Sequence, residues 1–186
     1  PPRTLSRAAS SPPSLPAPVF YSQPQTVSHD SPGISLPAEV YLENVAARFT
    51  FARRDRPSVF DSFERHIFDA LRAMSRLLTA KHIDFFVAVY PDEVQVNPRL
   101  RRAMIERTSG VAPDYDWTRA QSLLDDFCAR NSIMFLDLLP AFRESHTRGE
   151  RLYIENNPHW NDTGNHLAAA LLYKALHDQA ARHLQP

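Results

Sequence analysis

Two short apolar runs set among amphipathic segments constrain the fold of this chain more than any other feature. Residues 83–90 are rich in aromatic and β-branched side chains and are followed by Pro91, and residues 133–138 have the same character. Runs of this length are typical of strands covered on both faces. Because parallel strands are joined by crossover connections, helical segments around such runs predict an α/β fold.

A long helix is predicted after Pro57, with Ser58 and Asp61 as its N-terminal cap. Its apolar side chains recur every three or four residues, which predicts one stripe that faces a core. These side chains are Phe60, Phe63, Ile67, Leu71, Met74 and Leu78.

Four other helices are predicted from periodicity and end signals, over residues 38–51, 98–108, 116–131 and from about 162 onward. The second of these starts at Asn97 and Pro98, which suit a cap and a first helical position. A loop that contains Pro140 and Gly149 is expected to join the second strand to the last helix. The side chains expected to point inward are Leu42, Val45, Ala46 and Phe49 in the first, Trp117, Ala120, Leu124, Phe127 and Cys128 in the third, and Leu167, Leu171 and Ala175 in the last.

The first 37 residues differ in composition from the rest of the chain. They hold nine of the 16 prolines and eight serines but only three charged side chains. Proline fixes φ and removes a backbone donor, so we expect a linker or surface arm here, with a short strand at Val19–Phe20–Tyr21 as an alternative. The domain itself is then expected over residues 38–186.

Two strands make a sheet too narrow to cover several amphipathic helices, since most sheets have four to six strands. The sequence therefore predicts an incomplete sheet whose remaining strands lie before Pro1 or come from another chain. We interpret residues 38–186 as the C-terminal part of a larger α/β domain.

Composition excludes several classes of function. Lys plus Arg and Asp plus Glu both number 21, so the net charge gives no reason to expect nucleic acid or an anionic membrane as a partner. The apolar runs are shorter than the roughly 20 residues of a membrane span. The single cysteine, Cys128, excludes an intrachain disulfide and is expected in the core. No cofactor or metal is expected, and neither localisation nor oligomeric state is indicated.

Polar residues that could take part in catalysis cluster just before the last predicted helix. His159 lies two residues before Asn161, which, like Asp162, can cap that helix. Trp160 offers an aromatic wall, and an imidazole held on fixed backbone can carry a proton between a hydroxyl and a leaving group. Asp92 and Glu93 follow the first predicted strand, where they either line a cleft or cap a helix.

Residues 152–169 resemble the last conserved block of the SGNH (GDSL-type) esterase and acyltransferase superfamily, Asp-x-His-Trp-Asn-x-x-Gly followed by an alanine-rich helix. Residues 124–143 and 87–96 are similar to the segments that precede that block. The resemblance implies a three-layer α/β/α flavodoxin-like (SGNH) sandwich, incomplete on its N-terminal side. It also implies a serine nucleophile with His159 as general base, acting on an ester such as an acetylated carbohydrate, with Trp160 and Asn161 in the substrate site.

The chain departs from the family pattern in two ways. The Gly-Asp-Ser block and the Gly and Gly-x-Asn segments of the oxyanion hole are absent, so the nucleophile is expected outside this chain. Asn157 stands where the pattern has the catalytic aspartate, and an amide in this place is expected to hold the wrong imidazole tautomer and to supply no charge. Substitutes for the missing carboxylate are Asp137, Glu155, Asp162 or a backbone carbonyl.

Two other functions are compatible with these departures. One is an inactive SGNH-like domain that binds carbohydrate or a protein, and the other is an unrelated α/β interaction module. A Gly-Asp-Ser element in the coding sequence before Pro1 would favour the enzyme.

Overall fold

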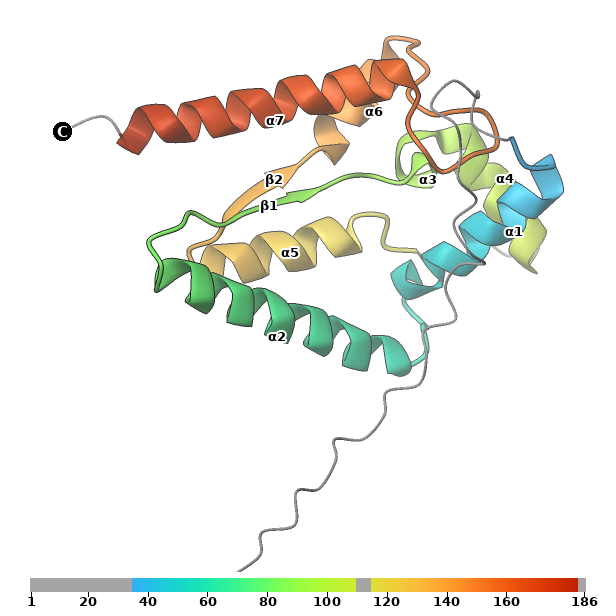
Figure 1. The fold of residues 1–186 in the computed structure, drawn as a ribbon. Coiled ribbons are helices and arrows are strands. Elements are labelled where there is room, and N and C mark those ends of the chain that lie inside the picture. The colour runs from blue at the N-terminus through green and yellow to red at the C-terminus, as the bar shows by residue number, and fades with distance from the viewer. Residues whose placement is uncertain (1–34, 110–114, 184–186) are drawn as a thin grey trace, which may run out of the picture. The chain divides into compact units, whose positions relative to one another are not determined.

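Two parallel strands, β1 (Phe86–Val89) and β2 (Met134–Asp137), form the centre of the fold in the computed structural model (Figure 1). They pair with Phe86 opposite Met134 and Val89 opposite Asp137. The structure describes residues 35–109 and 115–183, and all of them belong to one compact unit. The predicted strands at residues 83–90 and 133–138 are confirmed with shorter ends.

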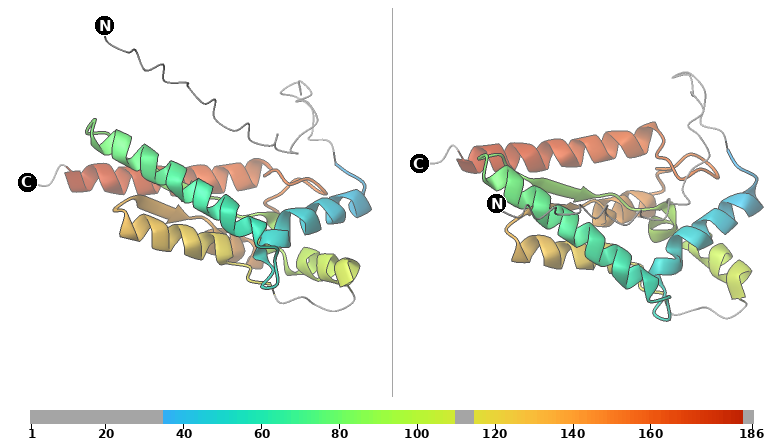
Figure 2. Two further views of the ribbon diagram at one scale, coloured as in Figure 1. Left: turned by 90° about the horizontal axis from the view of Figure 1, so that it is seen from below. Right: turned by 60° about the horizontal axis from the view of Figure 1, so that its bottom comes forward.

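Helices account for most of the remaining described chain, and the two parallel strands among them are compatible with the predicted α/β class. In Figure 1, α7 lies on one side of the two strands, and α2 and α5 lie on the other. Figure 2 shows α2 and α5 side by side from two further directions. The helices are α1 (Ala38–Arg48), a 3-10 turn η1 (Phe49–Ala52), α2 (Val59–Thr79), α3 (Glu93–Val96), α4 (Pro98–Ser109), α5 (Arg119–Arg130), α6 (Leu139–Thr147) and α7 (Asp162–His183).

The alternation of side chains along the strands divides the core into two parts. Phe135 and Val87 pack with buried Phe127 and Cys128 of α5, while Leu136 packs with the cluster under α7. Neighbouring residues of a strand point to opposite faces, so each face of the strand pair contacts a different helix. The predicted core position of Cys128 is confirmed.

A third cluster lies where α1 meets α3 and α4. Val45 of α1 is fully buried against Val94 and Met104. The predicted inward face of the first helix is confirmed, because Phe49 is buried as well. This cluster fixes α1 against the segment that follows β1.

Two helices follow the strands where no helix was predicted. α3 follows β1, and Asp92 forms a capping box with Gln95 at its start. α6 replaces the predicted loop after β2, with Pro140 in its first turn, where the missing backbone donor costs nothing. Asn97 was correctly predicted to cap α4, since its side chain accepts hydrogen bonds from the backbone of Arg99 and Leu100.

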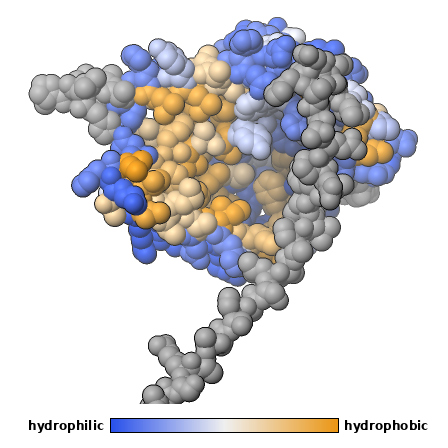
Figure 3. Space-filling view, viewed as in Figure 1, coloured by the Kyte–Doolittle hydropathy of each residue, from blue (hydrophilic) through white to orange (hydrophobic). Residues whose placement is uncertain are grey.

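The prediction that the apolar stripe of α2 faces a core is wrong for most of its length. None of its residues is buried, and Phe63, Ile67 and Met74 are 57%, 54% and 48% exposed. Only Phe68 and Leu71 pack against the cluster around α5. Figure 3 shows apolar side chains gathered between α7 and α2. They are exposed because a sheet of two strands is too narrow to cover both helices.

Two smaller expectations have different outcomes. Ser58 precedes α2 as predicted, but its side chain makes no capping hydrogen bond. The candidate strand at Val19–Phe20–Tyr21 lies outside the described residues. None of the described helices combines the length and apolar character needed to cross a membrane.

Candidate functional site

The loop that carries His159 connects α6 to α7 and is tied together by its own backbone. Tyr153 and Trp160 form an isolated antiparallel bridge, and the N–H of Ile154 donates to the carbonyl of His159 at 3.0 Å. The N–H of Leu36, just before α1, donates to the carbonyl of Asn156 at 3.1 Å. His159 therefore lies next to the bridge of a hairpin that is also bound to the segment before α1.

Asn161 fixes the end of this hairpin to α7. Its side-chain oxygen accepts the backbone N–H of Gly164 at 3.0 Å, which confirms the predicted cap. Its side-chain nitrogen donates to the carbonyl of Arg151 at 2.8 Å. Both ends of the amide are thus engaged within the loop, and substrate binding by Asn161 stays a prediction.

Gly164 allows the first turn of α7 to approach the hairpin. A Cβ at this position would overlap the carbonyl oxygen of Leu152 and would lie 2.9 Å from the Cβ of Trp160. The glycine of the family pattern is therefore required here by a close approach between two backbones.

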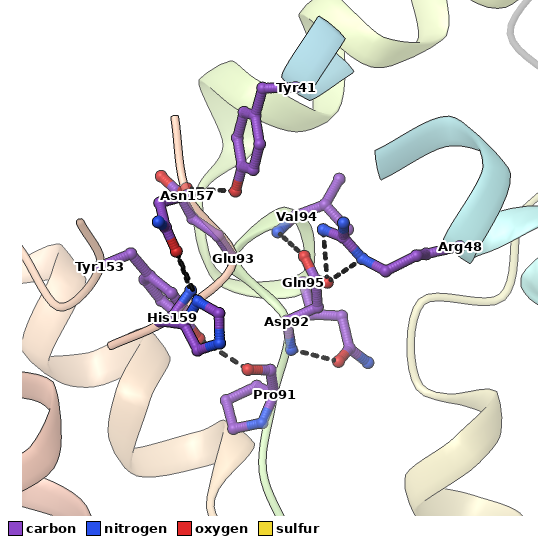
Figure 4. Close-up of polar contacts among 10 residues, drawn as sticks. All are labelled: Tyr41, Arg48, Pro91, Asp92, Glu93, Val94, Gln95, Tyr153, Asn157 and His159. Carbon is purple, nitrogen blue, oxygen red and sulfur yellow. Dashed lines mark hydrogen bonds and ion pairs between the residues drawn. The ribbon is translucent and has the colours of Figure 1, made fainter. Parts of the chain in front are cut away.

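Asn157 and His159 form the hydrogen-bonded pair at the centre of the site (Figure 4). The side-chain oxygen of Asn157 lies 2.6 Å from Nδ1 of His159 and 2.9 Å from its backbone nitrogen. A backbone N–H can only donate, so the Asn157 atom between these two nitrogens is the oxygen. The same oxygen then requires a proton on Nδ1.

This orientation argues against the expectation that Asn157 holds the wrong tautomer. With the proton on Nδ1, the lone pair of the neutral ring is on Nε2, which is the form that a general base requires. His159 is exposed and Asn157 is buried, so the base faces outward on a fixed support. Across residues 35–109 and 115–183, no serine hydroxyl is hydrogen-bonded to the ring.

Trp160 lies within an aromatic group beside the histidine. The centroid of its ring lies 5.1 Å from that of Phe142 and 5.6 Å from that of Tyr90, which it meets edge to face. Tyr90 follows β1 and is 69% exposed. The half-buried indole therefore supports the loop and also borders an exposed aromatic surface.

The segment that follows β1 contacts this loop, and its two acidic residues bind side chains of α1. The hydroxyl of buried Tyr153 donates to the carbonyl of Pro91 at 2.8 Å, which joins the hairpin to the β1 exit. Asp92 pairs with Arg48 of α1 at 2.9 Å. Glu93 accepts a hydrogen bond from the hydroxyl of Tyr41 at 2.8 Å. Tyr41 and Arg48 lie on α1, and no local signal in the sequence indicated their partners.

Three carboxylates were suggested as substitutes for the missing aspartate, and each of them is either hydrogen-bonded elsewhere or exposed to solvent. Asp137 accepts the backbone N–H of Leu139 at 2.8 Å, and burial raises its pKa, which disfavours its charged form. Glu155 is exposed and pairs with Arg151 at 3.4 Å. Asp162 is exposed in the first turn of α7. None of the three is hydrogen-bonded to His159.

Comparison with known families agrees with this geometry. A family model described as "SGNH hydrolase-like domain, acetyltransferase AlgX" matches residues 59–186, which is more than half of the chain and includes both strands and the histidine loop. No curated protein and no solved structure matches. The chain therefore belongs to the family of SGNH hydrolase-like domains of the acetyltransferase AlgX type.

Proposed function

We propose that this chain supplies the general base of an acyl-transfer site, which moves an acetyl group between an ester and a hydroxyl or water. The observation that carries the proposal is the 2.6 Å contact between Nδ1 of His159 and the side-chain oxygen of Asn157. The family match supports the same class of reaction, since its description names an acetyltransferase.

His159 would act twice in such a reaction. Its Nε2 takes the proton of a serine hydroxyl as the oxygen attacks the ester carbonyl, and the resulting imidazolium gives that proton to the departing oxygen. A sugar hydroxyl or water then repeats the steps on the acyl-serine. Asn157 keeps the ring in place and in the right tautomer throughout.

The serine and the oxyanion donors are proposed to come from polypeptide outside these 186 residues. In the same proposal, β1 and β2 belong to a wider sheet of a three-layer SGNH sandwich. The exposed stripe of α2 supports this arrangement, because further strands beside β1 would cover Phe63 and Ile67.

An acetylated carbohydrate is the proposed substrate class. Sugar rings present apolar C–H faces that pack on aromatic side chains, and Trp160 and Tyr90 provide such a surface beside His159. Asn161 contributes to substrate binding in this proposal by fixing the position of Trp160 through its bonds to the loop.

The 186-residue chain alone is expected to hydrolyse p-nitrophenyl acetate no faster than its His159→Ala variant, because a base without a nucleophile and an oxyanion hole stabilises no tetrahedral intermediate. Absorbance of p-nitrophenolate measures both rates, with free imidazole at the same concentration as the reference. Turnover that depends on His159 would show that this chain contains its own nucleophile.

The second candidate function is an SGNH-like domain that binds carbohydrate or a protein without catalysis. The lack of a charge on Asn157 favours it. A fluorophosphonate probe distinguishes the two in the assembled protein, since only an activated serine reacts with it. Labelling of one serine that is lost in His159→Ala supports the enzyme, and no labelling supports the binding domain.

A further inference from the structure

Asn157 favours the tautomer of His159 that a general base requires, but the amide carries no negative charge to stabilise the imidazolium. A proton taken by Nε2 makes the ring an imidazolium, which a nearby carboxylate stabilises and a neutral amide stabilises much less. The carboxylates of the loop, Glu150 and Glu155, and Asp162 at the start of α7 are all exposed, so solvent screens their charges.

The ionisable groups on the elements that meet at this loop come from several parts of the chain. They are Tyr41 and Arg48 on α1, Tyr90, Asp92 and Glu93 after β1, Asp137 and Arg143 around the start of α6, Arg148, Glu150, Arg151, Tyr153 and Glu155 in the loop, and Asp162 and His166 on α7.

Most of the carboxylates in this set are already neutralised or committed. Asp92 lies 2.9 Å from Arg48, and it also accepts the N–H of Val94 as the cap of α3. Asp137 accepts a hydrogen bond from the first backbone N–H of α6, and burial disfavours its charge. The charge of Asp92 is therefore offset in part by Arg48, and that of Asp137 is disfavoured by burial.

Glu93 differs from Asp92 and Asp137 because both of its carboxylate oxygens accept hydrogen bonds from neutral side chains. The hydroxyl of Tyr41 donates to one carboxylate oxygen at 2.8 Å, and the side-chain nitrogen of Asn97 donates to the other at 3.0 Å. Among the described residues Glu93 has no ion pair. The residue is half-buried, and in Figure 4 its side chain extends toward Asn157.

Tyr41 is the buried partner of this carboxylate. The Tyr41 side chain is 2% exposed. Burial, and then the charge of Glu93, raise its pKa well above the usual range, so it stays a hydrogen-bond donor. On the hairpin, burial is the main cause that raises the pKa of Tyr153, and the charges of Asp92 and Glu93 raise it further.

We infer that Glu93 supplies, from behind Asn157, the negative charge that stabilises the imidazolium of His159, and that Tyr41 positions it. The family pattern places one aspartate two residues before the histidine. In this chain two residues take the two functions of that aspartate, because Asn157 sets the tautomer of His159 and Glu93 provides the negative charge. The inference rests on the proposed role of His159 as a base.

The test measures the charge on the ring without any catalysis. Diethyl pyrocarbonate modifies neutral imidazole, and mass spectrometry of the peptide that contains His159 gives its modification rate in the full 186-residue chain. Glu93→Gln keeps the shape of the side chain and one acceptor oxygen but removes the charge. We expect the rate at pH 6 to rise about threefold, because the imidazolium loses a stabilising charge. At pH 8.5 we expect no change, because imidazole is then neutral in both proteins.

Glu155→Gln is the matched control, because it removes an exposed carboxylate four residues from His159. We expect less than half of the Glu93→Gln effect at pH 6. An unchanged rate for Glu93→Gln at pH 6 would overturn the inference. An equal change at both pH values would also overturn it, since Glu93 would then control access to the ring and not its charge. Neither result concerns the nucleophile, so the proposed function is tested separately by the fluorophosphonate experiment.

Discussion

Replacing His159 with alanine is expected to slow acyl transfer about 10²–10⁴-fold in the assembled enzyme, the range that a positioned general base contributes. The structure explains the size of the effect. Nδ1 is bound to Asn157, so Nε2 is the free basic atom, and no other histidine lies in the loop. The rate of p-nitrophenyl acetate hydrolysis under single-turnover conditions measures the loss at the acylation step.

His166→Ala is the matched control for this prediction. His166 lies seven residues later and is exposed on α7, and its side chain makes no hydrogen bond within the described part of the chain. Its removal should leave the acylation rate within about twofold, because a solvent-exposed side chain outside the loop stabilises no charge there. Equal losses in both variants would show that His159 has no special role in proton transfer.

Replacing Gly164 with alanine is expected to lower the free energy of unfolding by about 3 kcal/mol, the upper part of the range for overpacking. The added methyl group would overlap the carbonyl oxygen of Leu152, which cannot rotate away as a side chain would. The first turn of α7 would have to move away from the hairpin that carries His159. Urea unfolding followed by circular dichroism measures the change.

Thr163→Ala provides the comparison in the same helical turn. Thr163 is exposed, and we expect its replacement to change the free energy of unfolding by less than about 0.5 kcal/mol. A Gly164→Ala protein as stable as Thr163→Ala would mean that the close approach between α7 and the hairpin is absent in solution.

The parts of the fold that were predictable depend on local signals. The strands were indicated by apolar runs, and the start of α7 by Asn161. α6 was missed because Pro140 suggests a loop, although proline is equally compatible with a first helical turn. α3 has four residues, which is too short to show any periodicity.

The amphipathic stripe of α2 shows what periodicity leaves undetermined. The spacing correctly predicted a helix with one apolar face, but spacing contains no information about what covers that face. Here Phe63 and Met74 are exposed, because no described element packs over them.

The candidate site was predictable only in part, for a related reason. His159 and Asn157 are two residues apart, and an Asn side chain commonly accepts the N–H two residues later, so the orientation of this amide could have been inferred. The contact of Tyr41 with Glu93 joins residues 52 positions apart. Such a pair depends on how α1 packs against α3, which no local pattern encodes.

The nitrogen resonances of the His159 ring test the central claim most directly. In the ¹⁵N-labelled chain at a pH where imidazole is neutral, we expect Nδ1 to resonate as a protonated, pyrrole-type nitrogen and Nε2 as an unprotonated, pyridine-type nitrogen. Asn157→Leu should remove this preference, because the accepting oxygen is lost. The reverse assignment in the unmodified chain, with the proton on Nε2, would contradict the account, since His159 could not then act as the base.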